Sequence, residues 1–258
     1  MATRVPTVVM LHASASSSRQ WQPLAATLGE RFRVHAIDLH GHGERSPWQG
    51  ARPLELVDEV ALAAPFVLRA GGAHLVGHSY GAAVALKLAA MLPDHVRSVT
   101  VYEPVMFRWL VEASADEASD ILRVVDALRR HLAFGSMHDA AREFVDFWSG
   151  EGAFDAAGAS RRDAIASRMR SVASHFHALL MEPLSLHQFA RLCIPMMVMT
   201  GGRTVRAMRR LEQMTQQAWP HACHRVIGAA GHMGPITHAE EFNREAAAFL
   251  EREVRMAA

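Results

Sequence analysis

The stretch that decides the fold runs from His74 to Ala90 and reads HLVGHSYGAAVALKLAA. A short apolar run leads into the pentapeptide Gly-His-Ser-Tyr-Gly, and a run of helix-forming residues follows it directly. When a GxSxG sequence joins a strand to a helix, its serine, here Ser79, sits in a strained turn at the carboxyl edge of a parallel sheet. Gly77 and Gly81 leave room there for neighbouring backbone. We therefore expect a strand, a sharp turn and a helix in that order.

Ser79 needs two kinds of partner if it is to act as a nucleophile. Its hydroxyl reacts poorly at neutral pH, so a base must lie within hydrogen-bond reach. Donors must also hold the oxyanion that forms when the hydroxyl attacks a carbonyl carbon, and the N–H of Tyr80 at the start of the helix is one candidate. The alternative is a turn serine that only caps the helix ending near Leu92, but the strand and helix around it favour the nucleophile.

Short apolar and β-branched runs alternate with amphipathic helical patterns along the chain. This alternation is typical of an α/β fold in which a mainly parallel sheet carries helices on both faces. The predicted strands are Thr7–Leu11, Phe32–Ile37, His74–Gly77, Val96–Tyr102, Pro195–Thr200 and His224–Ile227.

One connection breaks this alternation. Between Tyr102 and Pro195 there is no convincing strand, and the span is far too long for a loop in a compact domain. We predict a helical cap over residues 105–192, inserted into a core formed by residues 1–104 and 193–258. Three serines with an acid three residues on, close to the capping-box pattern, predict helix starts at Ser114, Ser136 and Ser160. Apolar residues from Ile165 to Leu179 continue the third helix at helical spacing.

Composition excludes several classes of partner. The 258 residues are half hydrophobic and carry a formal net charge of +1, with no block of like charge. We therefore expect no nucleic-acid surface and no anionic-membrane surface. No apolar run approaches the roughly 20 residues that span a bilayer, and the first residues do not look like a leader. Cys193 and Cys223 are far apart, which favours a reducing, cytoplasmic setting.

Taken together, these features resemble an α/β-hydrolase with a helical cap, and the resemblance covers nearly the whole chain. The matching segments are VVMLHASASSSRQW, IDLHGHGERS, GHSYG, CIPMMVMTGG and GAAGHMGPITH. The resemblance implies a second oxyanion donor at the N–H of Ser14. Two departures are expected: the usual His-Gly is His12-Ala13 here, and the sequence predicts no antiparallel hairpin in front of the first strand. A sheet of about six parallel strands is therefore expected.

Sixteen histidines compete for the role of the base. His232 lies in a glycine-bracketed loop after the last predicted strand, where the triad order of this fold, serine then acid then histidine, places the base. His238 is better suited to begin the final helix or to line the pocket. Others, such as His74 and His175, are expected in partly buried or solvated roles. A metal site in LHGHG or HACH is an alternative, although no three ligands show metal spacing.

The acid is harder to place. Most relatives carry it just after the strand that follows the cap, near Thr204, but no carboxylate is present from Thr200 to Leu211. A minority of the fold, including the haloalkane dehalogenases, carry it at the end of the strand after the elbow, where this chain has Glu103. The resemblance therefore favours Glu103 over a purely structural Glu-Pro turn. Its carboxylate is then expected within about 3 Å of a ring nitrogen of His232.

Two other carboxylates are assigned structural roles. Glu212 falls well inside a helix and is expected on its solvated face. Asp38 falls in a turn and is expected to accept hydrogen bonds from backbone N–H groups.

The expected function is hydrolysis of a small carboxylic ester or a related carbonyl compound, without a cofactor or metal. The partner is then a small molecule, and the sequence indicates no oligomeric state. We expect the cap to close over the sheet edge and a largely apolar pocket lined by His12, Phe107, Trp109 and Trp148. Two alternatives stay open: a carbon–carbon bond hydrolase or lyase on the same fold, and a receptor that keeps the triad only to bind a ligand.

Overall fold

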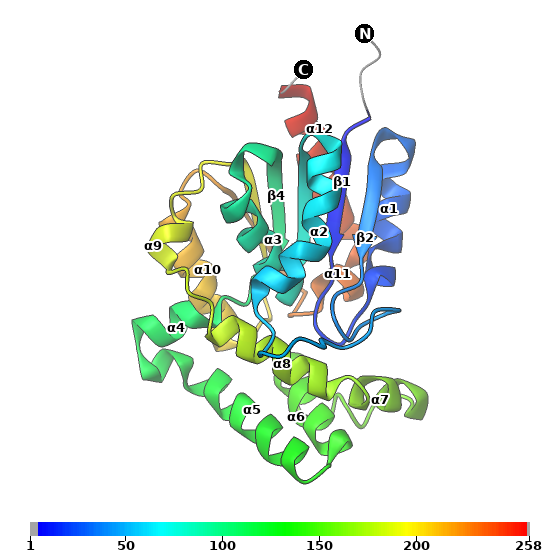
Figure 1. The fold of residues 1–258 in the computed structure, drawn as a ribbon, viewed down its shortest axis with the longest axis vertical. Helices are drawn as coiled ribbons and strands as arrows, with labels where there is room; N and C mark the ends of the chain where they lie inside the picture. The colour runs from blue at the N-terminus through cyan, green and yellow to red at the C-terminus, as the bar shows by residue number, and fades with distance from the viewer. Residues whose placement is uncertain (1–4, 257–258) are drawn as a thin grey trace.

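The computed structural model describes residues 5–256 and contains a six-stranded sheet whose neighbouring strands all run parallel (Figure 1). The strand order is β2-β1-β3-β4-β5-β6. The order reverses between β1 and β3, and in open sheets of this kind ligands bind at the carboxyl ends of the strands where this reversal occurs. The strands are β1 Thr7–Leu11, β2 Arg33–Ile37, β3 Ala73–His78, β4 Val96–Tyr102, β5 Met196–Gly201 and β6 Cys223–Ile227.

The predicted parallel α/β fold is confirmed, and the six strands lie where the sequence indicates, with shifts of one residue at some ends. β5 begins at Met196 instead of Pro195, since proline has no N–H to donate to a neighbouring strand. β3 is one residue longer at each end and therefore includes Ala73 and His78.

Helices cover both faces of the sheet: α1 (Gln22–Leu28) and α12 (Ala239–Met256) cover one, and α2 (Leu56–Ala70), α3 (Tyr80–Met91) and α10 (Arg206–Ala218) cover the other. Alternate residues of β1 face opposite layers of helices. Val8 and Met10 pack against α1 and α12. Val9 and Leu11 pack against the layer of α2, α3 and α10. This alternation follows from the pleat of a strand. The sheet is therefore buried on both faces, as parallel sheets usually are.

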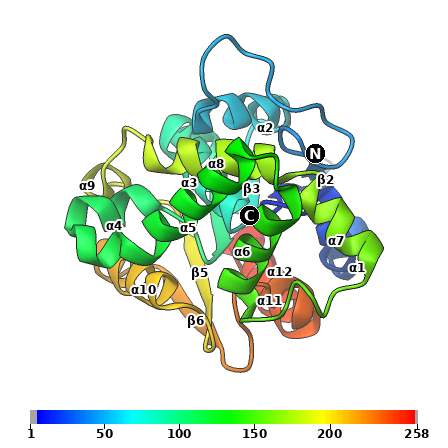
Figure 2. The ribbon, with the colours of Figure 1, turned by 90° about the horizontal axis from the view of Figure 1, so that it is seen from below.

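The chain between β4 and β5 forms helices only: α4 (Phe107–Ala113), α5 (Ala115–Ala133), α6 (Met137–Ser149), α7 (Ala159–Ala166), α8 (Met169–Leu180) and α9 (Leu186–Phe189). Most of these helices lie across the carboxyl edge of the sheet, below it in Figure 1 and in front of it in Figure 2. We call α4 to α9 the cap helices. They face the edge to which the loops after β1 and β3 also lead.

The three predicted cap-helix starts agree with the structure to within one residue. The side chain of Ser114 accepts a hydrogen bond from the N–H of Glu117 at the start of α5, and Ser136 directly precedes α6. The third start is displaced by one residue, because α7 begins at Ala159, but the predicted continuation of this helix to Leu179 is wrong, because α7 ends at Ala166. The N–H of Arg168 bonds to the carbonyl of Ile165, a tight turn that ends α7 before α8 begins. The apolar pattern after Ser160 is therefore shared between two helices.

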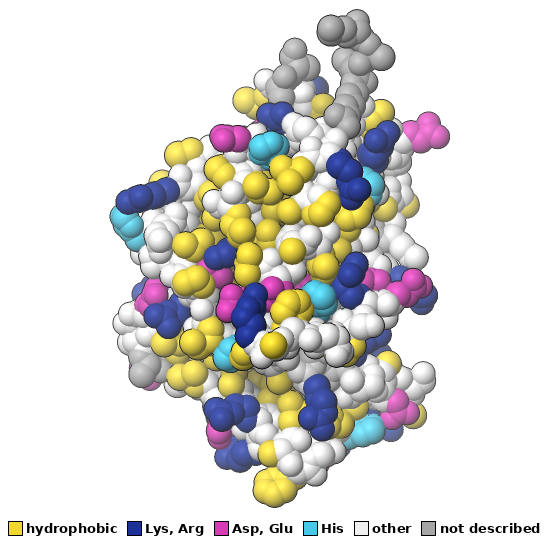
Figure 3. Space-filling view, viewed as in Figure 1, with side chains coloured by type: hydrophobic (Ala, Val, Ile, Leu, Met, Phe, Trp, Pro, Cys, Tyr) yellow, Lys and Arg dark blue, Asp and Glu magenta, His cyan; other side chains and the backbone are white. Residues whose placement is uncertain are grey.

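The molecular surface mixes charges of both signs. On the face drawn in Figure 3, basic and acidic side chains are interspersed across the middle of the molecule. This mixture agrees with the formal net charge of +1. None of the helices within residues 5–256 combines the length and the apolar character needed to cross a bilayer.

Candidate active site

Ser79 occupies the turn between β3 and α3 with φ 55° and ψ −117°. A conformation of this kind costs a residue other than glycine about 1–3 kcal/mol, so the surroundings must enforce it. A Cβ at Gly81 would overlap the carbonyl oxygen of Leu11, and a Cβ at Gly77 would press on Ala82. These close backbone approaches hold the turn, and Ser79 lines a pocket at the sheet edge.

His232 connects Ser79 to Glu103 through its two ring nitrogens. Nε2 lies 2.9 Å from Ser79 Oγ, and Nδ1 lies 2.6 Å from Glu103 Oε2. All three residues are buried, with 5% exposure or less. Because an ionised carboxylate can only accept, Nδ1 carries the proton and Nε2 is left to accept from the serine hydroxyl. A neutral imidazole in this orientation can take up the hydroxyl proton.

Glu103 follows the last residue of β4 and has a positive φ of 46°. Its Oε1 accepts from the N–H of Gly201 at 2.9 Å, and its Oε2 accepts from the hydroxyl of Thr204 at 2.8 Å. Thr204 stands where most relatives are expected to carry the acid, and here it donates to a carboxylate from another strand. With the imidazole as third donor, three hydrogen bonds fix the orientation of the Glu103 carboxyl group.

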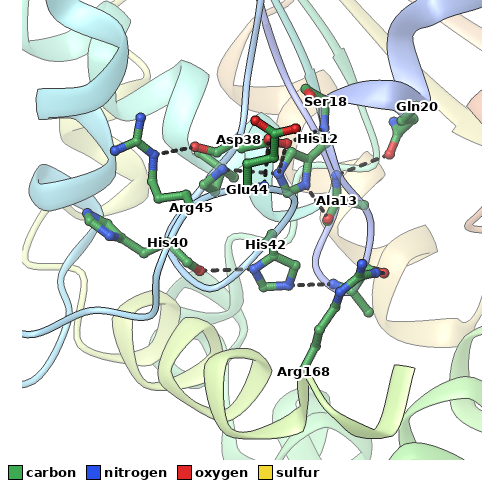
Figure 4. A network of polar contacts seen from close by, with 12 residues as sticks. His12, Ala13, Ser18, Gln20, Asp38, His40, His42, Glu44, Arg45 and Arg168 are labelled. Carbon is green, nitrogen blue, oxygen red and sulfur yellow. Dashed lines mark hydrogen bonds and ion pairs between the residues drawn. The ribbon is translucent and has the colours of Figure 1, made fainter. Parts of the chain in front are cut away.

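The other two carboxylates considered from the sequence lie elsewhere. Glu212 accepts from the side chain of Gln216 at 3.2 Å within α10. Asp38 accepts from the N–H groups of Ser18 and Glu44 at 2.7 and 3.1 Å (Figure 4), which confirms its predicted role in the turn. Within residues 5–256, neither carboxylate forms an ion pair with the proposed base.

Two buried side chains hold the loop that carries His232. The hydroxyl of Tyr102 donates to the carbonyl of Gly231 at 2.7 Å, and His78 Nε2 donates to the carbonyl of His232 at 2.8 Å. His78 Nδ1 in turn accepts from the amide of Gln20 at 2.9 Å. Burial, and next the proximity of the second imidazole, His232, hold the pKa of His78 well below its ordinary value, so His78 stays neutral. Sequence reasoning missed this role of His78, although its place inside the GxSxG motif was a signal.

The loop after β1 turns sharply at Ala15, where φ is 59°. The N–H of Ala15 donates to His42 Nε2 at 2.9 Å, and its carbonyl accepts from Arg168 Nη1 at 2.9 Å (Figure 4). Ser14 Oγ lies 2.8 Å from Nδ1 of His175. Core and cap therefore both hold this loop. Across residues 5–256, no protein acceptor takes the N–H of Ser14, which leaves it available for a ligand.

Tyr80, the first residue of α3, packs against the cap. Its ring lies flat on the ring of His175, with centroids 3.7 Å apart and planes 7° apart. His175 Nε2 is 3.6 Å from Glu59 Oε1 and makes no hydrogen bond to the described residues. Burial raises the pKa of Glu59 to about 7 and holds that of His175 well below its ordinary value. The expectation of a partly exposed His175 is wrong, because α8 presses it against Tyr80.

His12 lies beneath the loop and does not line the pocket, which corrects the prediction. Its Nδ1 donates to the carbonyl of Ala13 at 2.7 Å, and its Nε2 accepts from the N–H of Leu39 at 3.1 Å. Burial and the neighbouring His42 lower the pKa of His12 to about 3. A fully buried neutral histidine here joins the loop after β1 to the loop after β2.

A cavity of about 600 Å³ opens beside Ser79 and His232. Its walls come from the loop after β1, from α6 and α7 with their connecting turn, and from the residues that follow His232. Trp148 of α6 is on this wall and stacks on the imidazole of His232, with ring centroids 3.7 Å apart. The cavity lies at the reversal of strand order, where the topology favours a ligand site.

Phe107 and Trp109, two residues predicted to line the pocket, do not lie on its wall. Phe107 stacks behind Trp148 with centroids 6.4 Å apart. Trp109 packs edge-on against Phe189 and Trp219. Both side chains of α4 are fully buried. They fill the space between the cap helices and the core, because so much apolar area is more stable away from water.

The histidine-rich segments do not form a metal centre. No three His, Cys, Asp or Glu side chains in the described part of the chain are grouped so as to hold an ion. In LHGHG, His42 bonds to Ala15, and in HACH, His224 Nε2 donates to the carbonyl of Trp219 at 3.1 Å. These histidines fix loops.

Several known proteins are similar to this chain. A pimeloyl-(acyl-carrier protein) methyl ester esterase from Serratia marcescens is 26% identical over 255 residues, which are 94% of this chain and 93% of that protein. A 2-(acetamidomethylene)succinate hydrolase from Mesorhizobium japonicum is 33% identical over 134 residues, 50% of this chain and 48% of the relative. The chain thus spans less than half the length of that relative. It also spans 42% of a Mycobacterium tuberculosis lipase, LipV, with 37% identity.

Solved structures show the same architecture. The crystal structure of an enol-lactonase from Burkholderia xenovorans superposes with a TM-score of 0.76 at 20% identity, covering 96% of this chain and 92% of that one. A sequence model of the alpha/beta hydrolase family matches residues 8–245, most of the chain from β1 to α12. The chain therefore belongs to the alpha/beta hydrolase family.

Proposed function

We propose that this protein is a serine esterase that hydrolyses a carboxylic ester or a related acyl compound through Ser79, His232 and Glu103. The observation that carries the proposal is the position of the His232 ring, with Nε2 2.9 Å from Ser79 Oγ and Nδ1 2.6 Å from Glu103 Oε2. In such an arrangement the imidazole acts as the base while the buried carboxylate fixes its tautomer.

Acylation comes first. Ser79 Oγ attacks the carbonyl carbon of the ester, and His232 Nε2 takes the hydroxyl proton. The carbonyl oxygen becomes an oxyanion, to which the N–H groups of Ser14 and Tyr80 donate hydrogen bonds. When this intermediate collapses, the bond to the leaving oxygen breaks and His232 gives its proton to the departing alcohol. The acyl group stays on Ser79 as an ester.

Water completes the cycle. His232 Nε2 takes a proton from a water molecule, whose oxygen attacks the acyl carbon on Ser79. The second oxyanion is held by the same two N–H groups. Its collapse breaks the bond to Oγ and returns the proton to Ser79, and the carboxylic acid leaves. Each turnover consumes one ester and one water and yields one acid and one alcohol.

The electrostatics of the three residues support this cycle. Each step that charges His232 places an imidazolium 2.6 Å from Glu103, a charge-assisted contact that is stronger than a neutral hydrogen bond. The pair is buried, so the attraction is screened less than it would be in water. The names of the relatives point in the same direction, since an esterase and a hydrolase are among them.

The proposal is tested with esters and with a covalent probe. Purified protein should hydrolyse p-nitrophenyl esters of graded chain length and react with a fluorophosphonate, with the label on Ser79 by mass spectrometry. Ser79→Ala should lose nearly all turnover and all labelling but unfold at the same denaturant concentration, whereas Ser160→Ala, at an exposed serine of α7, should retain both. Folded wild-type protein that neither turns over esters nor takes the label would contradict the proposal.

A further inference from the structure

The cavity beside Ser79 carries an unbalanced set of charges. Among the described residues its wall includes three arginines, Arg19, Arg161 and Arg168, and no aspartate or glutamate. The chain as a whole has 27 basic residues, lysine and arginine together, against 26 acidic ones. A wall with three cations and no acid therefore does not follow from the overall composition.

None of these three guanidinium groups forms an ion pair with a carboxylate of residues 5–256. Nearby arginines of the cap helices do have such partners. Arg142 of α6 lies 2.8 Å from Asp139 and 3.1 Å from Asp155, and Arg162 of α7 lies 4.0 Å from Asp155. Arg142 and Arg162, which are not on the cavity wall, are therefore paired, whereas Arg161 and Arg168 on the wall form no ion pair with the described residues.

Arg168 is the wall arginine that contacts the loop of Ser14. Its Nη1 donates to the carbonyl of Ala15, the residue that follows Ser14 (Figure 4). A carbonyl oxygen does not neutralise the guanidinium, whose remaining N–H groups can still donate. Burial lowers the pKa of His12 and of His42, and the nearby charge of Arg168 adds a smaller lowering to each.

Apolar side chains form much of the remaining wall. Phe144, Val145 and Trp148 come from α6, Ile165 from α7, and Ile236 from the segment after His232. A short hydrocarbon chain can lie against them, while a negatively charged end meets the arginines. Planar guanidinium groups suit a carboxylate especially well, since they can donate two parallel hydrogen bonds.

Building on the proposed esterase function, we propose that the physiological substrate is an ester that carries a free carboxylate, and that Arg19, Arg161 and Arg168 bind that carboxylate. The site takes no part in bond making. It binds the charged group while Ser79 attacks the ester at the other end of the molecule. The enzyme is then selective for half-esters of dicarboxylic acids, or for esters of hydroxy acids, over neutral esters of equal size.

Matched pairs of esters test this selectivity. Monomethyl esters of dicarboxylic acids of graded length carry the charge on the acyl side, and acetyl esters of hydroxy acids carry it on the alcohol side. Each is compared with its fully esterified neutral form. We expect kcat/KM to be at least about tenfold higher for the charged member of one series. KM for that member should rise with ionic strength, because salt screens a partly exposed charge pair.

Variants of the wall assign the effect to its arginines. Arg161→Gln and Arg168→Gln should each reduce the ratio of charged to neutral kcat/KM about threefold to tenfold, and Arg168→Lys should restore part of it. The matched control is Arg162→Gln on the same helix, whose arginine faces Asp155 and is not on the wall. It should leave the ratio unchanged. A preference for the neutral esters, or a ratio unaffected by both wall variants, would overturn the proposal.

Direct binding separates this inference from the esterase function. Glutarate is titrated calorimetrically into Ser79→Ala protein, which cannot turn over a substrate by the proposed route. Binding that weakens in Arg161→Gln and Arg168→Gln backgrounds, but not in Arg162→Gln, supports the carboxylate site even if no ester is hydrolysed. If neither glutarate nor a charged ester product binds, the carboxylate site is refuted, while hydrolysis of neutral esters would leave the esterase proposal standing.

Discussion

The indole ring of Trp148 lies nearly flat on the imidazole ring of His232, with centroids 3.7 Å apart and planes 20° apart. The first residue belongs to the cap helices and the second to the core. The stack limits the access of water to His232, which is 3% exposed. It also offers an aromatic face to the imidazolium that forms during turnover, which is a favourable contact. The cap thus touches the proposed base itself.

Trp148→Ala should therefore change the enzyme in two measurable ways. Loss of the ring from the pocket wall should lower kcat/KM for bulky p-nitrophenyl esters about tenfold more than for the acetate. Loss of its packing should lower the free energy of unfolding by about 3–5 kcal/mol. Trp148→Phe should retain most of the activity on bulky esters and most of the free energy of unfolding. An unchanged ranking of substrates in Trp148→Ala, together with lower stability, would show that the ring only packs.

Glu103→Gln should reduce kcat by up to about 10⁴, because the amide can present an NH₂ to His232 and carries no charge to stabilise the imidazolium. Steady-state kinetics on p-nitrophenyl butyrate would measure this loss. Glu212→Gln, at a carboxylate that bonds within α10, is the matched control and should retain wild-type kcat. Equal activities of the two variants would remove Glu103 from the mechanism.

The relocation of the acid is tested by moving it back. The hydroxyl of Thr204 donates to Glu103 from the position where most relatives are expected to carry the acid. In a Glu103→Gln, Thr204→Asp double variant, the new carboxylate should recover part of the lost kcat. Thr204→Asp alone should lower stability, because it buries a second negative charge beside the first. If a folded double variant recovers no kcat, an acid can orient His232 only from the position at the end of β4.

His175→Ala should lower kcat about tenfold with little change in KM. The residue touches Ser14 Oγ and the ring of Tyr80, the two residues whose N–H groups are proposed to hold the oxyanion. Displaced donors weaken transition-state binding more than substrate binding. Ser14→Ala, which keeps the backbone N–H, is the comparison and should retain most of kcat. A larger KM with unchanged kcat in His175→Ala would contradict a role in positioning the donors.

Acid should destabilise the protein below pH 6.5. Burial lowers the pKa of His12 to about 3 and those of His42 and His74 to about 4, from an ordinary value of 6.5. Between these values the unfolded chain binds protons that the folded chain does not, so stability is lost as the pH falls. Glu59 partly offsets the loss, because its pKa is raised to about 7 and it binds a proton more readily in the folded state.

Urea unfolding at a series of pH values would measure this loss. The free energy of unfolding should be nearly constant above pH 7 and should fall by several kcal/mol toward pH 4. His74→Gln removes a titrating group that lies away from the active site and bonds to Ser98. Between pH 7 and pH 4, the free energy of unfolding of this variant should fall by up to about 3 kcal/mol less than that of the wild type. If the free energy of unfolding falls equally with pH in both proteins, His74 does not contribute to the loss.

The sheet and the meeting point of its loops could be predicted from sequence because both follow from local patterns and topology. The β-branched run Val96–Tyr102 predicts a strand from its local sequence alone, and β4 has the same bounds in the structure. β3 and β4 are neighbours in a parallel sheet, so Ser79 and Glu103, which directly follow them, must emerge at one edge. The loop after β6 brings His232 to the same edge.

The contacts of the cap could not be predicted in this way. Ser14 and His175 are 161 residues apart, and the spacing of apolar residues on α8 does not say which loop its polar side chains reach. The misplacement of Phe107 and Trp109 has a related cause. A large aromatic residue that packs between two layers and one that faces a ligand look the same in a sequence, since both are removed from water.

The hold of the cap on Ser14 and Ala15 bears on attempts to recombine proteins of this family. Both Arg168 and His175 lie in the segment between β4 and β5, yet they contact the loop after β1. A chimera that receives its cap from a relative would gain new pocket walls and lose these two contacts. Such a transplant would succeed only if the donor helix supplied equivalent groups, or if the loop after β1 travelled with the cap. For this protein, the loop and the cap therefore form one exchangeable block.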